Sequence, residues 1–451
     1  MSMTRFRALA VVAAATVLSC GNQAYRAAER GDQARLRSEI APKHERGKIT
    51  NEEAACLARA VASRELATAK DDYTATSRVR ESRACAVELD DALGDRMKRH
   101  DGAGAEAALL RLEDGKLSEG DARDYLSDPD DRWRAVGTRT LHREDDTKRR
   151  QAAMVDPSPR VRRSAMRAAS QAKDLADLDL LFEAARVDPE LLLRNEALRA
   201  MSQILRGAAG GRDRAAEHVT RLRDLWTGGD DAIKEDVAVA WALAPVFESG
   251  GREALRVELA TGRGPGVIAA AGVVLRNAPR DSELASSASA LVARVIDEGA
   301  RRDRLHAITL ARTTGIELDA LRKAAKEDDR DVKVPALARL LESKPDRDAA
   351  VRDLEAIAGQ GLPGSKAPGA DEPRAIEAAS RARLALATAG HLRIQAWIEQ
   401  DLSAPDAHRR LGAASALAAL GRPARAVMLL TDPDASVRTR AACTMLVASR
   451  R

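Results

Sequence analysis

The chain has 451 residues, enough for two or three ordinary domains or for one extended array of repeats. Charged residues make up 32% of it and aromatic residues only 2%, and its net charge at pH 7 is +5. Because helix formers outweigh the β-branched and aromatic residues that favour strands, this composition excludes a β-rich fold and predicts a mostly α-helical protein.

The N-terminal residues have the pattern of a signal peptide. Two arginines precede an uncharged apolar run over residues 8–18, which is too short to cross a bilayer as a stable helix. The run ends in Val17-Leu18-Ser19-Cys20, which resembles the lipobox of bacterial lipoproteins. This resemblance implies cleavage after residue 19 and lipidation of Cys20. The alternative is an ordinary cleaved signal with an incidental cysteine.

The lipobox resemblance predicts an exported protein that is lipid-anchored to the cell envelope. In a Gram-negative source it implies the periplasmic side of the outer membrane, because Gly21 replaces the aspartate that retains lipoproteins at the inner membrane. Two or three acyl chains suffice for lasting attachment. Removal of residues 1–19 takes away two arginines and no acidic residue, which lowers the net charge to +3. No later apolar stretch is long enough to span a membrane.

Residues 20–117 form the predicted N-terminal cap region, which is helical. Residues 27–32, followed by Leu36, resemble the helix–turn–helix centre of an ankyrin repeat, although the usual Thr-Pro-Leu-His opening is missing. An ankyrin-like pair is therefore one option, and a helical cap of no named family is the other.

Three cysteines remain besides Cys20. Residues 51–69 and 74–93 predict two helices joined by a short polar turn, and Cys56 and Cys85 lie at equal distances from that turn. Cysteines so placed face each other across a helical hairpin, and the alanines beside them allow the close approach that a disulfide needs. In an oxidising compartment we predict a Cys56–Cys85 disulfide. The alternative is two small buried residues that never pair, and Cys443 is expected to be a small buried residue.

A pattern that recurs four times gives the strongest signal in the chain. An Asp-Pro pair is followed by arginine six positions after the aspartate, and small or apolar residues then recur at helical spacing. The four copies are Asp128 with Arg134, Asp156 with Arg162, Asp188 with Arg194, and Asp432 with Arg438. We expect each aspartate to cap a helix whose first residue is the proline. One pair of short helices cannot cover its own apolar face, so neighbouring pairs are expected to stack.

These segments resemble the HEAT family, in particular its bacterial short-repeat branch, which includes phycobilisome lyase-like proteins. The resemblance implies two antiparallel helices per unit, with the eight aspartates and arginines forming a ladder between neighbouring units. Weaker copies begin near residues 233, 332 and 409, so the resemblance covers roughly residues 118–451. The glycine- and proline-rich residues 359–373 predict an irregular loop inserted between repeat helices.

Motifs for catalysis and metal binding are absent or incomplete. The seven histidines include no HExxH and no pair at helical spacing, and the chain has no CxxC. His100-Asp101 lacks the other ligands of an HD hydrolase, and Ser170 with Lys173 forms a Ser-x-x-Lys without its partner motifs. Residues 359–366 have Gly-Ser-Lys where a P-loop needs Gly-Lys-Ser or Gly-Lys-Thr. We therefore expect no catalytic residue, no metal and no cofactor.

The basic run of residues 148–150, with arginines at 160, 162 and 163, is the one candidate nucleic-acid surface. The signal peptide, the small net charge and the scarcity of aromatic residues for stacking argue against that partner. We expect these arginines to be ladder residues and a solvated face, with anionic lipids or acidic polymers as alternative partners.

Together these observations predict an all-α protein. It consists of a signal peptide (1–19), a helical cap (20–117) and an α-solenoid of HEAT-type pairs (118–451) with an insertion at 359–373. The expected function is that of an exported, membrane-tethered scaffold that binds a protein or peptide partner. The alternative is an enzyme, or an enzyme accessory of the lyase-like HEAT class, whose site the sequence does not reveal.

Overall fold

The computed structural model of the protein describes residues 22–360 and 373–450. All regular structure in these residues is helical, which confirms the prediction of an all-α fold. The helices form two compact units, one made of residues 1–117 with 351–451 and the other of residues 118–350. We refer to them as unit 1 and unit 2.

Unit 2 is a succession of short helices. In chain order they are α8 (Glu119–Arg123), η2 (Asp124–Ser127), α9 (Asp131–Thr138), η3 (Glu144–Asp146), α10 (Thr147–Met154), α11 (Pro159–Ala172), η4 (Leu175–Asp177), α12 (Leu178–Val187), α13 (Leu191–Gly207), α14 (Gly211–Gly228), α15 (Asp231–Trp241), α16 (Ala244–Val246), η5 (Phe247–Gly251), α17 (Arg252–Thr261), α18 (Pro265–Asn277), α19 (Ser282–Glu298), α20 (Arg301–Leu310), α21 (Gly315–Ala324) and α22 (Arg330–Leu340). Helix α23 (Arg347–Ala358) crosses the boundary to unit 1.

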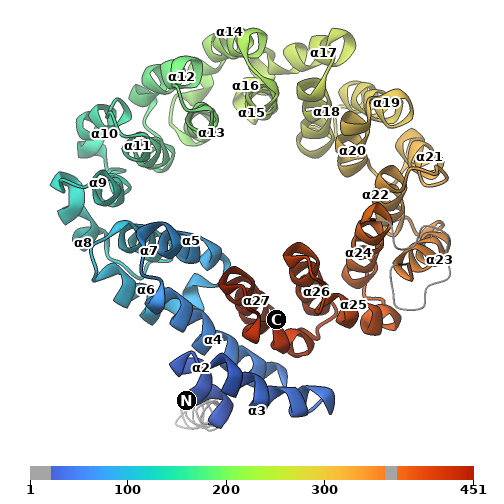
Figure 1. Cartoon of the computed structure of the whole chain (residues 1–451). Coiled ribbons are helices and arrows are strands. Elements are labelled where there is room, and N and C mark those ends of the chain that lie inside the picture. Colours follow the sequence, from blue (N-terminus) through green and yellow to red (C-terminus); the bar gives the residue numbers. More distant parts are fainter. Residues whose placement is uncertain (1–21, 361–372, 451) are drawn as a thin grey trace, which may run out of the picture. The chain divides into compact units, whose positions relative to one another are not determined.

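Within unit 2 the helices stand in two rows (Figure 1). One row holds α10, α12, α14, α17, α19 and α21, and the other holds α9, α11, α13, α15, α18, α20 and α22. Helices pack in pairs across the rows, as α12 does with α13, and they also contact helices of their own row, as α11 does with α13. The apolar core lies between the rows, and α18 is buried continuously from Gly266 to Leu275. A helix that is apolar on all sides needs neighbours on all sides, and α15, α17, α19 and α20 provide them.

Polar residues just before the helices satisfy their first amides. Asp230 accepts a hydrogen bond from the amide of Ile233 at 3.0 Å, and Asp281 accepts one from the amide of Leu284 at 3.1 Å. These caps start α15 and α19 in a part of the chain where the Asp-Pro pattern is weak.

The Asp-Pro aspartates do not cap their helices, so that expectation is wrong. The N-cap of each helix lies two residues after the aspartate. In each copy the helix begins three residues after the aspartate, and the proline precedes the N-cap. The aspartate instead forms a turn of its own, as when Asp156 Oδ1 accepts from the amide of Ser158 at 2.7 Å. The physical reason is the proline ring, which holds the preceding residue in an extended conformation, with ψ of 131° at Asp188 and 144° at Asp432.

Unit 1 joins the two ends of the chain. Its N-terminal helices are α2 (Gln23–Arg30), α3 (Gln33–Glu45), α4 (Asn51–Thr68), α5 (Asp72–Glu81), η1 (Arg83–Leu89), α6 (Asp90–Met97) and α7 (Gly102–Glu113). Its C-terminal helices are α24 (Pro373–Thr388), η6 (Leu392–Ile394), α25 (Gln395–Asp401), α26 (Ala407–Ala419), η7 (Pro423–Thr431) and α27 (Ala435–Ala448).

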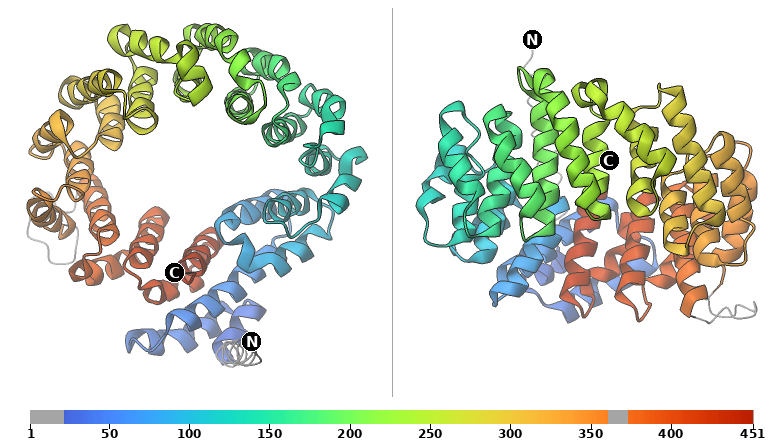
Figure 2. Two further views of the ribbon diagram at one scale, coloured as in Figure 1. Left: turned by 180° about the vertical axis from the view of Figure 1, so that it is seen from behind. Right: turned by 90° about the horizontal axis from the view of Figure 1, so that it is seen from above.

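Helix α27 packs on α4 as closely as successive helices pack within the repeats. It also contacts α5 and η1, and Figure 2 shows the red C-terminal helices against the blue N-terminal ones. Residues 118–451, which the repeat pattern groups together, are therefore divided between the two compact units. Helices α23 and α24 flank the predicted insertion, and residues 361–372 lie outside the described part of the chain.

No helix among the described residues is long and apolar enough to cross a membrane.

Candidate binding surface

The arginine six residues after each Asp-Pro aspartate connects one helical pair to the next. Arg162 donates from Nε and Nη2 to the carboxylate of Asp188 at 2.9 and 3.1 Å. Its Nη1 donates to the carbonyl oxygens of Asp156 and Pro157 at 3.0 and 3.1 Å. One guanidinium therefore holds its own turn and the turn of the following pair together.

The same arrangement recurs near the C-terminus. Arg410, which belongs to a weaker copy of the pattern, donates to the Asp432 carboxylate at 2.7 and 3.1 Å. It also donates to the carbonyl oxygens of Ala404 and Pro405 at 2.9 and 2.7 Å. A turn can thus be held in this way without an Asp-Pro sequence before it.

Two of the predicted ladder arginines mainly hold their own turns. Arg134 donates to the carbonyl oxygens of Asp128 and Pro129 at 3.1 and 2.9 Å, but its nearest approach to the Asp156 carboxylate is 3.9 Å. Arg194 donates to the carbonyl oxygen of Asp188 at 2.6 Å.

Arg438 continues the ladder into the N-terminal helices. Its Nη1 donates to the carbonyl oxygen of Asp432 at 2.6 Å, while its Nε pairs with Glu65 of α4 at 2.6 Å. Glu65 occupies the place that the next aspartate has in the repeats. The sequence gives no sign of this partner, because no Asp-Pro pair lies near residue 65.

A second set of arginines joins neighbouring helical pairs through contacts in the interior of the protein. The fully buried Arg150 donates to Asp177 at 2.6 Å and to Asp174 at 3.0 Å, and it also donates to the Leu141 carbonyl oxygen at 3.0 Å. Burial raises the pKa of Asp177, although Arg150 opposes this effect. Buried charges of this kind are stable only when paired and hydrogen-bonded, so the set depends on every member.

Similar contacts occur at Arg123 with Asp146 and at Arg383 with Asp401, the latter at 2.6 Å. We expected a solvated face and ladder residues in the basic run of residues 148–150. Its first two residues are exposed, but Arg150 is completely buried.

The exposed surface of the row that contains α11 and α13 carries ion pairs from helix to helix. Arg163 and Arg167 of α11 both contact Glu196 of α13 at 3.2 Å. Arg199 of α13 contacts Asp236 of α15 at the same distance. These contacts cover the grooves between adjacent helices with alternating charge, as on a surface that faces water.

Each unit carries a cavity large enough for a small group of side chains. One, of about 400 Å³, lies in unit 1 between α26, α27 and the residues around Ala84. The other, of about 420 Å³, lies in unit 2 beside the turn that joins α17 to α18, and its rim includes Arg263, Arg294 and Glu298.

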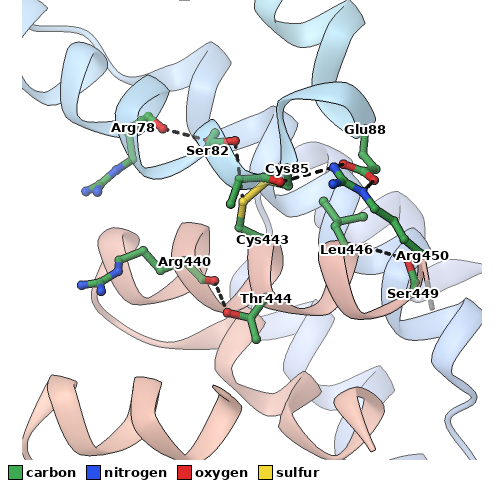
Figure 3. The surroundings of a disulfide bond; sticks show 11 residues. Arg78, Ser82, Cys85, Glu88, Arg440, Cys443, Thr444, Leu446, Ser449 and Arg450 are labelled. Carbon is green, nitrogen blue, oxygen red and sulfur yellow. Dashed lines mark hydrogen bonds and ion pairs between the residues drawn. A yellow bond between two sulfur atoms is a disulfide. The ribbon is translucent and has the colours of Figure 1, made fainter. Parts of the chain in front are cut away.

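The predicted Cys56–Cys85 disulfide is wrong. Cys85 is bonded to Cys443, with 5.3 Å between their Cα atoms, so it is not the partner of Cys56. The expected second helix of the hairpin breaks after Glu81, and Cys85 lies in η1 with non-helical φ and ψ of −118° and 23°. That break places Cys85 against α27 (Figure 3). Cys443 is buried as expected, but it is bonded, and Cys20 lies outside the described residues.

The residues considered for catalysis have structural roles. Asp101 caps α7 by accepting from the amide of Gly104 at 2.8 Å and pairs with Arg96 at 2.5 Å. Ser170 donates its hydroxyl to the carbonyl oxygen of Arg167 at 2.8 Å. Across residues 22–360 and 373–450 no group of three histidine, cysteine or acidic side chains is placed to hold a metal ion.

Comparison with known proteins adds little to this geometry. No protein-family model matches the sequence, and no curated protein matches it. A crystal structure of an engineered protein from the Northeast Structural Genomics Consortium is 17% identical and covers 86% of this chain and 98% of its own. Its TM-score is 0.27, which is too low to support a conclusion about fold or function.

Proposed function

We propose that the chain is an exported HEAT-type α-solenoid, tethered to a membrane through a lipid on Cys20, that acts as a scaffold for a protein or peptide partner. The observation that carries the proposal is the contact set of Arg162, repeated at Arg410 and Arg438. In each case a single side chain ties one turn to the next element. Stacked pairs tied in this way present an extended, rigid surface, which is how repeat arrays bind their partners.

The helix-to-helix ion pairs support a binding role. Arg163 and Arg199 expose much of their side chains while they pair with acidic residues of the next helix. Charged groups that are fixed in this way can steer and orient a partner without large losses of side-chain entropy. The tether rests on the lipobox resemblance, and the second and third acyl chains of a lipoprotein would make it lasting.

The test compares the native protein with a Cys20→Ala variant in cells. We expect the wild-type protein to fractionate with membranes and to yield one reproducible crosslinked partner, and the variant to become soluble. An unchanged distribution of the variant would contradict the lipid anchor. Failure of the wild-type protein to capture any partner, across crosslinkers of different reach, would contradict the scaffold role.

A further inference from the structure

The groove between α26 and α27 differs in charge from the groove between α11 and α13 of unit 2. In α11 the residues one and five positions after the ladder arginine are Arg163 and Arg167, and both pair with Glu196 of the next helix. Glu196 lies two positions after the ladder arginine of α13. These three side chains cover the groove between α11 and α13.

The same register positions in α26 and α27 carry Leu411, Ser415 and Arg440. No ion pair can form between these three side chains. The guanidinium of Arg440 is exposed and makes no ion pair or hydrogen bond with any described residue. At the position where α13 has the anionic Glu196, α27 therefore has the cationic Arg440. The corresponding positions of α26 carry no acidic side chain to balance it.

An open cavity of about 400 Å³ occupies this groove. Leu411 and Val447 give it an apolar lining, and the small side chains of Ala418, Ala419 and Ala448 allow another chain to approach closely. The other charged residue at its edge is Glu81, whose carboxylate already pairs with Arg78 at 2.5 Å and accepts a hydrogen bond from the Ser436 hydroxyl at 2.5 Å. The unbalanced charge of the groove is therefore positive.

The disulfide fixes the wall of the cavity. Cys443 lines it from α27 and is bonded to Cys85 (Figure 3). Ala84, which precedes Cys85, lines it from the N-terminal side. On the same helix, the carbonyl oxygen of Arg440 accepts a hydrogen bond from the Thr444 hydroxyl at 2.9 Å. The two walls are thus held at a set separation before any ligand arrives, which lowers the entropic cost of binding.

We propose that this groove binds a short acidic, apolar peptide segment of the protein partner, with a carboxylate on Arg440 and small apolar side chains over Leu411 and Val447. This inference rests on the proposed scaffold function and names the chemistry of its partner. A cavity of this volume suits a few side chains, since small-ligand sites span about 300–1,000 Å³. A stable dimer would instead need a face of about 800 Å² on each copy.

The test uses the purified full chain and a fluorescein-labelled peptide in which leucine and alanine alternate with glutamate. Fluorescence anisotropy is measured for the wild-type protein and for Arg440→Glu, with Arg422→Glu as the matched control. Arg422 is an exposed arginine of the same unit that does not line the cavity. We expect Arg440→Glu to weaken binding about tenfold and to favour a second peptide with lysine in place of glutamate. The control should bind like the wild type.

A second variant tests the cavity independently of charge. Ala419 is exposed at the rim, so Ala419→Trp can fill the groove without disturbing the core, and it should also weaken binding. The proposal is overturned if neither variant changes the affinity, or if anionic phospholipid vesicles bind in an Arg440-dependent way while the peptide does not. A further outcome would overturn the proposal but leave the scaffold role intact: the double variant Arg440→Glu with Ala419→Trp captures the cellular partner as well as the wild-type protein does.

Discussion

His218 of α14 is a titratable side chain that the fold buries without a hydrogen-bond partner. Its side chain is fully buried, and neither ring nitrogen has a partner in the described part of the chain. Burial, with a smaller contribution from Arg221, lowers the pKa of His218 from 6.5 to about 4. The neutral imidazole is therefore the form that the folded state accepts.

This shift predicts a loss of stability in acid. A pKa that is lower in the folded state than in the unfolded state means that the unfolded chain binds more protons between pH 6.5 and about 4. The contribution of His218 to the free energy of unfolding is complete above pH 6.5. It falls by about 3 kcal/mol as the pH drops to about 4. In the wild type, the free energy of urea unfolding should fall as the pH is lowered through this range. In His218→Leu this fall should be smaller by the contribution of His218. Equal slopes in both proteins would contradict the assignment.

We expect the internal arginine Arg150 to contribute more to stability than the ladder arginine Arg162, because the Arg150–Asp177 pair is completely buried whereas Arg162 is partly exposed. Arg150→Met would leave Asp177 buried without its countercharge, and removal of one partner of a buried pair costs about 3–5 kcal/mol. The free energy of urea unfolding measures the loss.

The adjacent residue provides the control for that measurement. Arg149 is exposed, so Arg149→Met should change the free energy of unfolding by no more than about 0.5 kcal/mol. The double variant Arg150→Met with Asp177→Leu should recover most of the loss, because no uncompensated charge stays buried. A loss in the double variant equal to the sum of the two single losses would contradict this account.

Helix content was predictable from the sequence, because alanine, leucine and arginine at helical spacing leave few alternatives to a helix. The contacts of Arg162 and Asp188 were also predictable, since both residues belong to a local pattern that repeats. The burial of Arg150 was not predictable. It depends on a contact with an aspartate 27 positions away, and the basic run of residues 148–150 gives no sign of that contact.

The cysteine pairing failed for a related reason. A hairpin that pairs Cys56 with Cys85 requires one continuous helix after residue 74, but the helix ends at Glu81, where no proline or glycine marks the end. The partner of Cys85 lies 358 residues away, and the partner of Arg438 in α4 is 373 residues away. Local patterns carry no information about contacts at such separations.

At the scale of the whole chain, a covalent bond links the N-terminal and C-terminal segments of unit 1. The chain between Cys85 and Cys443 is long, so the bond restricts the unfolded state strongly. We predict that Cys85→Ala with Cys443→Ala lowers the free energy of unfolding of unit 1 by about 2–5 kcal/mol.

Peptide mapping without reductant checks the pairing itself. It should find Cys85 linked to Cys443, and a Cys56→Ala variant should keep that link. Recovery of a peptide that joins Cys56 to Cys85 would contradict the structure.

The packing of α27 on α4 also sets the timing of folding. During synthesis α4, at residues 51–68, appears long before α27, at residues 435–448. At about 5–20 residues per second, roughly 20–70 s separate them. Throughout that interval the face of α4 that α27 will cover stays bare, and a chain that is cut short before α27 never covers it. Helix α4 thus waits for α27, and closing so long a loop makes the completion of unit 1 a late event.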